Sequence, residues 1–498
     1  MKRFFLATSL LLTAWTVYGQ TTLPSNSKKA TLEGRDYIES TSYNEHLRGT
    51  ARSLQYYPDG EDFVCENGTN RFTRPLYGTH TAWRLETSDR PVFAVYNKPT
   101  SWNISFDLQC NGEIIPLDST TYCEARYTPG RRSYKLSDSR WNQGNLKGEL
   151  EIAVQPLPDK EGAIWYFKAS SMPKSIQLTG YVSHIRAKKL NRSGDMGADP
   201  ADSFEASKEL EPLRFAFNLP KGEGYIVYED GRLKQLSASK GKVLYEAAEK
   251  ARNTLMSRFK IDTPDPYINT LGGALVAAAD GIWDGEVWLH GANGWRMPLS
   301  GWRAAYTGDC LGWHDRARRH FDNYAASQVT DVPPVYPHST QDSAMNGARA
   351  EKKWGTQMYS NGYICRNPNR NNQMHHYDMN LCYIDELLWH LCWTGDLDYA
   401  KKVWPVITSH LAWEKRNFDP DNDGLYDAYC CIWASDALYY NSGAVTHSSA
   451  YNYRVNKLAA EIAEKIGEDA QPYAQEAEKI KQALQQRLWM QDKGCWAE

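Results

Sequence analysis

Aromatic rings alternate with charged groups in the densest polar stretch of the chain, residues 295–316. The side chains with chemical potential there are those of Trp302, Arg303, Asp309, Trp313 and His314. The two tryptophans can stack on the apolar face of a sugar ring. The arginine, aspartate and histidine can hold hydroxyls or a carboxylate by charge-assisted hydrogen bonds. This stretch predicts a sugar subsite; the alternative is that Asp309 or Asp315 forms a structural ion pair with a nearby arginine.

Asp436 is the strongest candidate for an acid catalyst, because it follows Trp433 in a stretch with few helical residues. Hydrolysis of a glycosidic bond needs one carboxylic acid that protonates the leaving oxygen and a second carboxylate that activates water or attacks the anomeric carbon. Burial beside a ring such as Trp433 favours the protonated form of the acid. The candidates for the second carboxylate are Asp309, Glu386 and Asp427.

Another polar cluster opens the helical pattern that carries Glu386. Its members are His375, His376 and Asp378. Two adjacent histidines without a third ligand at helical spacing do not make a metal site, so we expect this cluster to hydrogen-bond a substrate. The sequence contains neither a CxxC pair nor HExxH. We therefore expect no catalytic metal and no organic cofactor.

The run Asp419–Asp427 begins like a calcium-binding loop. An EF-hand requires a bidentate carboxylate at its twelfth position, and counting from Asp419 that position is Cys430. An Asp-rich turn between two helices is the preferred interpretation. A single calcium ion bound in another way is the alternative.

The hydrophobic pattern of the C-terminal half is helical. From about Gly241, apolar residues recur at spacings of three and four, beginning with Leu244 and Ala248. Similar patterns follow at 384–392, 403–411, 455–466 and 473–488. Long polar segments separate these helices, and such loops are usually functional. We expect an (α/α) helical-hairpin toroid over residues 241–498, with too few helices to close a ring and hence incomplete at the C-terminus; an irregular bundle is the alternative.

The preceding region, residues 20–240, reads as strands. Short runs of β-branched and aromatic residues alternate with turn residues, and Ile104–Leu108 precedes an Asn111–Gly112 pair. Both residues of that pair accept positive φ, which favours a tight hairpin. We expect an antiparallel β-sandwich.

Composition narrows the class of partner. The 498 residues carry a formal net charge of −3 with interspersed signs, which gives no basic surface for nucleic acid or anionic membrane. Trp (18) and Tyr (31) greatly outnumber Phe (13), so most rings carry a polar group that suits a carbohydrate. The simpler explanation for any one ring is that it belongs to the core.

The N-terminus reads as an export signal. Lys2 and Arg3 precede an apolar run from Phe4 to Val17, and Gly19 stands where a signal peptidase could cut. Gln20 follows in place of the cysteine that a lipoprotein would need. We expect residues 1–19 to be removed and the mature protein to be periplasmic or secreted, without insertion in a membrane.

Taken together, the stretches Trp295–Arg316 and Asp419–Asp436 resemble the six-hairpin glycosidases, a superfamily that includes bacterial α-L-rhamnosidases, trehalase, processing α-glucosidase and relatives of bile-acid β-glucosidase. Within it the chain looks most similar to an exported Bacteroidetes family with a domain labelled DUF4450. We expect the similarity to cover most of the chain from about Asp262 onward. The resemblance implies a toroidal glycoside hydrolase that acts on an oligosaccharide or polysaccharide.

The resemblance also implies roles for individual residues. The Asp423-Gly424-Leu425 turn, with Trp433 and Asp436 after it, is similar to the acid-bearing stretch of the bile-acid β-glucosidase relatives, which supports Asp436 as general acid. Gly308-Asp309 and Gly312-Trp313 resemble the rhamnosidase motif in a different order, which makes Asp309 a substrate-binding carboxylate rather than the base. In many such barrels the base lies on a late hairpin, beyond Glu498.

Three functions are compatible with these features. The leading hypothesis is hydrolysis of plant or host glycans by an inverting two-carboxylate mechanism. A toroidal polysaccharide lyase is the second, with Tyr306 or His314 as base and Arg303 to neutralise a uronate. A glycan-binding protein or truncated relative without turnover is the third.

Overall fold

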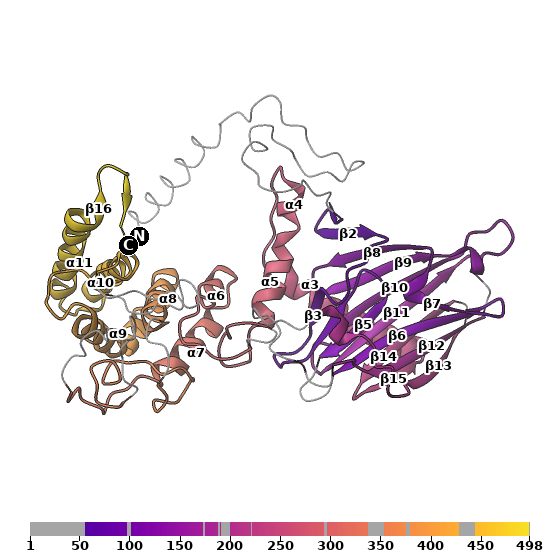
Figure 1. Ribbon diagram of the computed structural model, residues 1–498, viewed down its shortest axis with the longest axis horizontal. Coiled ribbons are helices and arrows are strands. Elements are labelled where there is room, and N and C mark those ends of the chain that lie inside the picture. Colours follow the sequence, from indigo (N-terminus) through magenta and orange to yellow (C-terminus); the bar gives the residue numbers. More distant parts are fainter. Residues whose placement is uncertain are drawn as a thin grey trace, which may run out of the picture.

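The computed structural model describes residues 55–96, 101–172, 175–187, 190, 200–220, 222–292, 296–336, 353–374, 379–427 and 444–497. Figure 1 shows strands gathered at one end of the molecule and α8–α11 at the other, with α3, α4 and α5 between them. Antiparallel sheets are therefore followed by a helical region, as the sequence predicts.

Two antiparallel sheets form the N-terminal sandwich. The first has the order β1 (Tyr57–Asp59), β2 (Asp62–Glu66), β8 (Tyr122–Thr128), β9 (Arg131–Ser137), β10 (Glu149–Pro156), β11 (Gly162–Ser170), β14 (Glu223–Glu229) and β15 (Arg232–Leu236). The second has the order β13 (Leu213–Pro220), β12 (Ser175–His184), β6 (Trp102–Cys110), β5 (Val92–Tyr96), β4 (Arg84–Thr87) and β3 (Arg74–Tyr77), and β7 (Glu113–Pro116) pairs with β6. The predicted hairpin joins β6 to β7, and both of its turn residues have positive φ, 52° at Asn111 and 83° at Gly112.

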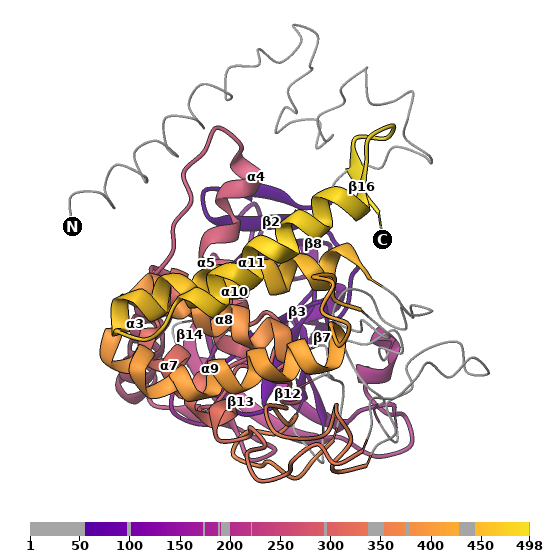
Figure 2. The ribbon, with the colours of Figure 1, turned by 90° about the vertical axis from the view of Figure 1, so that its left-hand side faces the viewer.

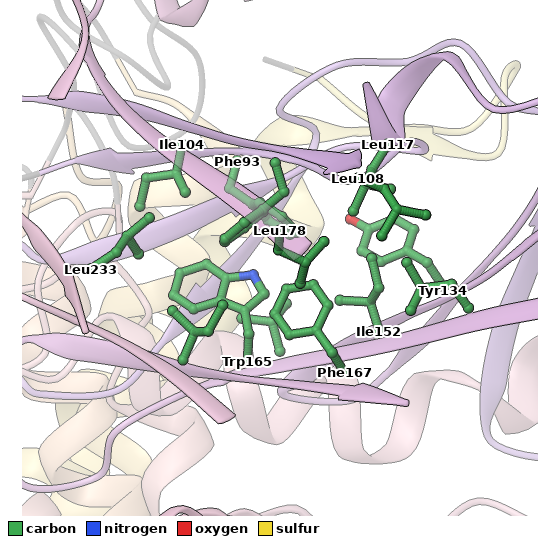
Figure 3. Close-up of a cluster of buried hydrophobic side chains, with 14 of the residues drawn as sticks. Phe93, Ile104, Leu108, Leu117, Tyr134, Ile152, Trp165, Phe167, Leu178 and Leu233 are labelled. Atoms are coloured by element: carbon green, nitrogen blue, oxygen red, sulfur yellow. The ribbon is translucent and has the colours of Figure 1, made fainter. Parts of the chain in front are cut away.

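Alternating side chains from both sheets fill the space between them. Along β9 and β10 buried and partly exposed residues alternate, as the pleat of a half-buried strand requires. Phe93 of the second sheet meets Trp165 of the first edge to face, with ring centroids 5.4 Å apart (Figure 3). Such contacts stabilise beyond the burial of apolar area, by about 0.5–1.5 kcal/mol for each ring pair.

The first helix of the C-terminal half packs on the sandwich. α3 (Ala238–Met256) contacts β10, β11 and β14, and its Ala248 is buried with Leu157 and Val227. Gly241 permits the approach, because a Cβ atom there would lie 2.4 Å from the Tyr225 side chain. The helical pattern predicted from Leu244 and Ala248 is therefore confirmed, and the helix ends at Met256.

The remaining helices follow in pairs. They are α4 (Pro266–Asn269), α5 (Leu271–Gly281), α6 (Tyr306–Cys310), α7 (His314–Ala325), α8 (Met379–Thr394), α9 (Leu397–Phe418), α10 (Thr446–Ile466) and α11 (Gln471–Ala483), followed by a π-helical turn (Leu484–Leu488) and a small hairpin of β16 (Trp489–Met490) and β17 (Cys495–Trp496). Short links join α8 to α9 and α10 to α11, with Gly395 (φ 61°) and Gly467 (φ 84°) as left-handed residues that stop the first helix of each pair. The two hairpins stack on each other through α8–α10 and α9–α10 contacts (Figure 2). Among the described helices, none is long and apolar enough to cross a membrane.

Candidate active site

The loop that precedes α6 lies directly against the beginning of α8. A Cβ atom on Gly301 would lie 2.0 Å from the carbonyl oxygen of Met379 and 2.5 Å from the amide nitrogen of Tyr383. No side chain fits between two backbones at that distance. Gly301 therefore brings the stretch that starts at Trp302 onto the face of α8 that carries two neighbouring carboxyl groups.

Glu386, one of the sequence candidates, is the more deeply buried of these carboxyl groups. Its side chain lies within α8 at 1% exposure. One carboxyl oxygen, Oε1, accepts a hydrogen bond from the backbone N–H of Ala305 at 3.1 Å, and Oε2 has no partner among the described residues. Burial, with the neighbouring charge of Asp385, raises the pKa of Glu386 well above its ordinary value. Burial therefore favours the protonated form of Glu386.

Asp385, the other carboxyl group, is also buried, but both of its oxygens have side-chain partners. Its Oδ1 forms an ion pair with Nε of Arg454, on α10, at 2.7 Å. Its Oδ2 accepts a hydrogen bond from the hydroxyl of Tyr306, on α6. Burial and nearby anionic groups raise the pKa of Tyr306, so this phenol stays protonated and donates. Side chains from α6 and α10 thus hold the carboxyl group of Asp385 on α8 in place.

Two neighbouring carboxyl groups with different partners are candidates for acid–base chemistry. Burial raises the pKa of Glu386, whereas Arg454 and Tyr306 hold the side chain of Asp385. A buried carboxyl group with a raised pKa is a candidate for a functional site. We call these two residues the α8 carboxyl pair.

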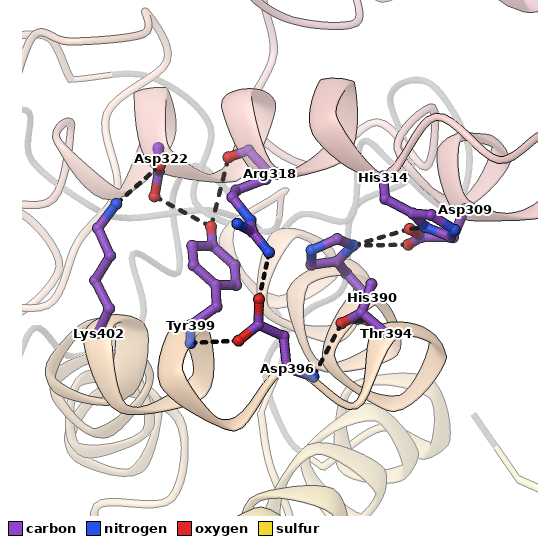
Figure 4. A network of polar contacts seen from close by, with 9 residues as sticks. All are labelled: Asp309, His314, Arg318, Asp322, His390, Thr394, Asp396, Tyr399 and Lys402. Carbon is purple, nitrogen blue, oxygen red and sulfur yellow. Dashed lines mark hydrogen bonds and ion pairs between the residues drawn. The ribbon is translucent and has the colours of Figure 1, made fainter.

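Asp309, also predicted from the sequence, lies in a separate network. It is 3% exposed, and Nδ1 of His314 lies 2.7 Å from its Oδ1. Nδ1 of His390, on α8, lies 2.9 Å from both of its oxygens (Figure 4). Two imidazoles thus engage this carboxylate, which links α6, α7 and α8. Asp309 is placed to hold these helices together.

We expect Asp309→Asn to lower the free energy of unfolding by about 1–3 kcal/mol, because the amide turns a donor toward a buried imidazole. Activity should fall less than tenfold. Denaturant unfolding and initial rates measure the two effects. Asp315→Asn, at an exposed position of α7, is the matched control and should change stability by at most about 0.5 kcal/mol. A hundredfold loss of activity at unchanged stability would instead make Asp309 catalytic.

The two tryptophans of the predicted subsite lie in different surroundings. Trp302 is partly exposed, with Arg303 5.6 Å from its ring centroid. Trp313 is 5% exposed and belongs to the helical core, where the guanidinium of Arg316 lies 4.3 Å from its ring centroid. In this structure Trp302 can present a face to a sugar and Trp313 cannot, because side chains already cover it. Arg303 and His314 are exposed.

The other sequence candidates lie outside the described residues. They are His375, His376, Asp378, Trp433 and Asp436. Asp427 is described, and it pairs through a β-bridge with Ala444. The described part of the site thus contains Glu386, Asp309, Trp302, Arg303 and His314 from the expected set.

Lysine and arginine side chains hold the Asp-rich turn after α9. Carboxylate oxygens of Asp419, Asp421 and Asp423 lie within 4.8 Å of one another, which is close enough for a metal ion. However, Lys415 forms an ion pair with Asp419, and Arg487 forms one with Asp423. Asp419 also accepts the backbone N–H groups of Asp423 and Gly424 at 2.8 and 3.1 Å. These contacts are those of a self-capped turn.

We expect removal of divalent cations to leave this turn intact, because its buried carboxylate is already paired. Dialysis against EDTA should change the melting temperature by less than 1 °C, a shift that corresponds to well under about 1 kcal/mol. Differential scanning fluorimetry with and without added calcium is the measurement. A rise of several degrees on adding calcium would establish a metal site.

Sequence reasoning missed the partners of the carboxyl groups. Arg454 lies 69 positions from Asp385, and His390 lies 81 positions from Asp309. His390 does fall four residues after Glu386, a spacing that places both on one face of a helix. Arg454 stands at a polar position of an amphipathic pattern and gives no local signal of its own.

Two family models match separate parts of the chain. Residues 370–498 match the bacterial α-L-rhamnosidase six-hairpin glycosidase domain. Residues 100–252 match DUF4450, a domain of unknown function. The DUF4450 range lies in the sandwich and α3, before the region near Asp262 where the sequence analysis expected the similarity to begin. No curated protein matches the chain.

Solved structures with some likeness include a GH78 family rhamnosidase of Bacillus sp. GL1, at 12% identity and a TM-score of 0.33 over 69% of this chain. The chain spans 34% of that rhamnosidase. A bacterial glucoamylase complexed with acarbose has 12% identity and a TM-score of 0.42, over 85% of this chain and 70% of its own. The family matches confirm the resemblance to both families: one region of this chain is similar to DUF4450 and another to the six-hairpin glycosidase domain. The stretch Asp419–Asp436 lies within the second match, and Trp295–Arg316 lies outside both.

Proposed function

We propose that this protein is a glycoside hydrolase whose α8 carboxyl pair cleaves a glycosidic bond. The observation that supports the proposal is the pairing of two carboxyl groups in the region that matches a six-hairpin glycosidase domain: Glu386 is buried with a raised pKa, and Asp385 forms an ion pair with Arg454. The substrate is a neutral or weakly charged oligosaccharide or polysaccharide of plant or host origin, in keeping with the partly exposed Trp302 beside Arg303.

Each carboxyl group has one part in the proposed reaction. Glu386 gives its proton to the leaving oxygen as the glycosidic bond breaks. The Asp385 carboxylate already accepts from Arg454 and Tyr306, which makes it a poor nucleophile. A water molecule therefore attacks the anomeric carbon, and Asp385 orients this water and takes the proton that it releases. Attack by water in a single displacement inverts the anomeric configuration. ¹H NMR of the first product should therefore show the inverted anomer.

Asp436 remains the acid implied by the resemblance to bile-acid β-glucosidase relatives, and it lies outside the described residues. If Asp436 is the acid, Glu386 has a structural part only. The variants Asp436→Asn and Glu386→Gln separate the two assignments, because only the true acid loses turnover on substrates with poor leaving groups.

A lyase is less well supported than a hydrolase. A lyase needs a free base at the substrate. Burial and neighbouring carboxyl groups raise the pKa of Tyr306, so the anionic form that would act as base is disfavoured. The Tyr306 hydroxyl donates to Asp385, and Nδ1 of His314 is engaged by Asp309 at 2.7 Å. We expect no unsaturated product absorbing in the ultraviolet from any uronate-containing polysaccharide.

The experiment is a screen of the purified protein against aryl glycosides and plant and host polysaccharides, with sugar release as the readout. Asp385→Asn and Glu386→Gln should each abolish release, whereas Asp315→Asn should retain it. Sugar binding without release by the wild-type protein would support the glycan-binding alternative. Failure of both variants to reduce release would overturn the assignment of the α8 carboxyl pair.

We also propose that the protein works outside the cytoplasm. The support is the charged, apolar and small-residue order of residues 1–19. N-terminal sequencing of protein recovered from the periplasm of a bacterial host should begin at Gln20. A mature protein that begins at Met1 would contradict the proposal.

A further inference from the structure

A cavity lies where the sandwich meets the helical region. Its volume is about 370 Å³, within the range of roughly 300–1,000 Å³ that is usual for ligand pockets. Tyr77 and Gln155 line it from the two sheets, Met256 from α3, Asp280 from α5 and Arg316 from α7. Pockets at a junction between domains are common binding sites. None of these residues belongs to the α8 carboxyl pair or to the network of Asp309.

A buried acceptor in this cavity lacks a donor. Gln155 is 1% exposed, and its Nε2 donates to the carbonyl oxygen of Tyr245 at 3.0 Å. Its Oε1 has no hydrogen-bond partner among the described residues. An unmet acceptor of this kind costs about 1–3 kcal/mol. A hydroxyl group brought by a ligand, or by water, would satisfy it.

Both arginines that line the cavity are already paired, and Asp159 adds a carboxylate to its wall. Arg316 contacts Asp280 at 2.7 Å, and His80 contacts the same carboxylate at 3.2 Å. Although burial alone would raise the pKa of Asp280, these two partners lower it, so the carboxylate stays ionised. Arg252 contacts Glu249 at 2.6 Å. With its arginines compensated, the cavity offers little attraction to an anion.

The remaining wall combines apolar surface with a phenol. Ala251, Leu255 and Met256 of α3 supply the apolar part. Burial raises the pKa of Tyr77, so its hydroxyl stays protonated and can both donate and accept a hydrogen bond. A sugar ring has the matching pattern, with C–H faces for the apolar wall and hydroxyls for Gln155 and Tyr77.

We propose that this cavity is a second carbohydrate site, separate from the α8 carboxyl pair, which binds one or two rings of a neutral sugar. The site would hold part of a glycan against both halves of the protein. It does not depend on the proposed hydrolysis, because a protein without turnover would still bind there.

The test is saturation-transfer NMR and calorimetric titration of the full chain with L-rhamnose, D-glucose and maltose, and with D-glucuronate as the anionic comparison. Ala251→Trp fills the cavity, and Ala247→Trp adds the same ring at an exposed position of the same helix. We expect at least one neutral sugar to bind, at least tenfold more weakly to Ala251→Trp and unchanged to Ala247→Trp and Glu386→Gln. D-glucuronate should bind no more tightly than D-glucose.

Two further measurements keep the proposal open to refutation if Ala251→Trp does not fold. Gln155→Met keeps the side-chain volume and removes the acceptor, so it should also weaken binding at least tenfold. Hydrogen exchange of the wild-type protein should slow at residues 77–80 and 251–256 when the bound sugar is added. The proposal is overturned if none of the neutral sugars binds, or if binding is the same in Ala251→Trp, or if the protected segments lie elsewhere.

Discussion

Replacing Glu386 with glutamine should nearly abolish hydrolysis of glycosides with poor leaving groups and leave the fold intact. Glutamine keeps the acceptor for the N–H of Ala305 and occupies nearly the same volume, but it has no acidic proton. Loss of a general acid typically costs about 10²–10⁴-fold in rate. Initial rates on the best aryl glycoside from the screen measure the loss, and circular dichroism verifies the fold.

The same variant should change how stability depends on pH. The pKa of Glu386 in the folded protein lies well above the ordinary value of 4.5. Below pH 4.5, Glu386 is protonated in both the folded and the unfolded protein. The stability that comes from the raised pKa is therefore fully present there. As pH rises from there toward the folded-state pKa, only the unfolded state releases its proton, and the free energy of unfolding falls by about 1.4 kcal/mol for each pH unit. Glutamine does not titrate. The variant should therefore gain stability relative to the wild-type protein as pH increases.

Denaturant unfolding of both proteins at several pH values from 4 to about 8 measures this difference. A difference in stability that stays constant over this window would show that Glu386 titrates normally. Together with unchanged activity, that result would remove Glu386 from the proposed mechanism. The pH dependence of kcat/KM adds an independent check, since activity should fall only above the raised pKa of the acid.

The second large effect is expected from Gly301→Ala. The new methyl group would lie 2.0 Å from the carbonyl oxygen of Met379, so either the loop or the beginning of α8 must move. Forced overpacking of this kind costs typically 1–3 kcal/mol, and contact with two backbone atoms places this variant at the upper end, about 3 kcal/mol. Activity should fall as well, because the loop leads into Ala305, whose N–H holds Glu386, and into Tyr306 of α6, whose hydroxyl holds Asp385.

Gly395→Ala is the matched control for this substitution. Gly395 has a φ of 61°, and a Cβ atom there would contact nothing within 4 Å. Its cost should be only the strain of a left-handed alanine, about 1–2 kcal/mol, with no loss of activity. Equal destabilisation by the two variants would mean that the loop moves away from α8 without penalty.

The elements of this fold could be predicted because each has a local signature. The period-two pattern and the Asn111–Gly112 turn predict the β6–β7 hairpin, and the helical spacing of apolar residues predicts α3 and α8–α11. The packing of α3 on the sandwich could not be predicted. It depends on Gly241 lying over Tyr225, and a glycine within a helical pattern carries no indication of its partner.

The candidate site could be predicted only in part. Glu386 was identified as a carboxyl group on a helix, but its protonation depends on burial and on Ala305, which lies 81 positions away. The ion pair of Asp385 with Arg454 joins α8 to α10, and the sequence does not indicate which residues of these two helices face each other. For Trp313 the sequence predicts a sugar contact that the structure does not allow. Residue type alone does not distinguish a ring that is free to stack on a sugar from one that Arg316 covers.

The most direct test of the central claim compares two leaving groups on one sugar. A general acid matters for a poorly acidic phenol and hardly at all for dinitrophenol, which leaves without a proton. We predict that Glu386→Gln reduces kcat/KM at least a hundredfold on the unsubstituted phenyl glycoside and less than tenfold on the dinitrophenyl glycoside, with Asp315→Asn unchanged on both. Equal losses on the two substrates, or the same leaving-group dependence in Asp436→Asn alone, would contradict the assignment of Glu386 as the acid.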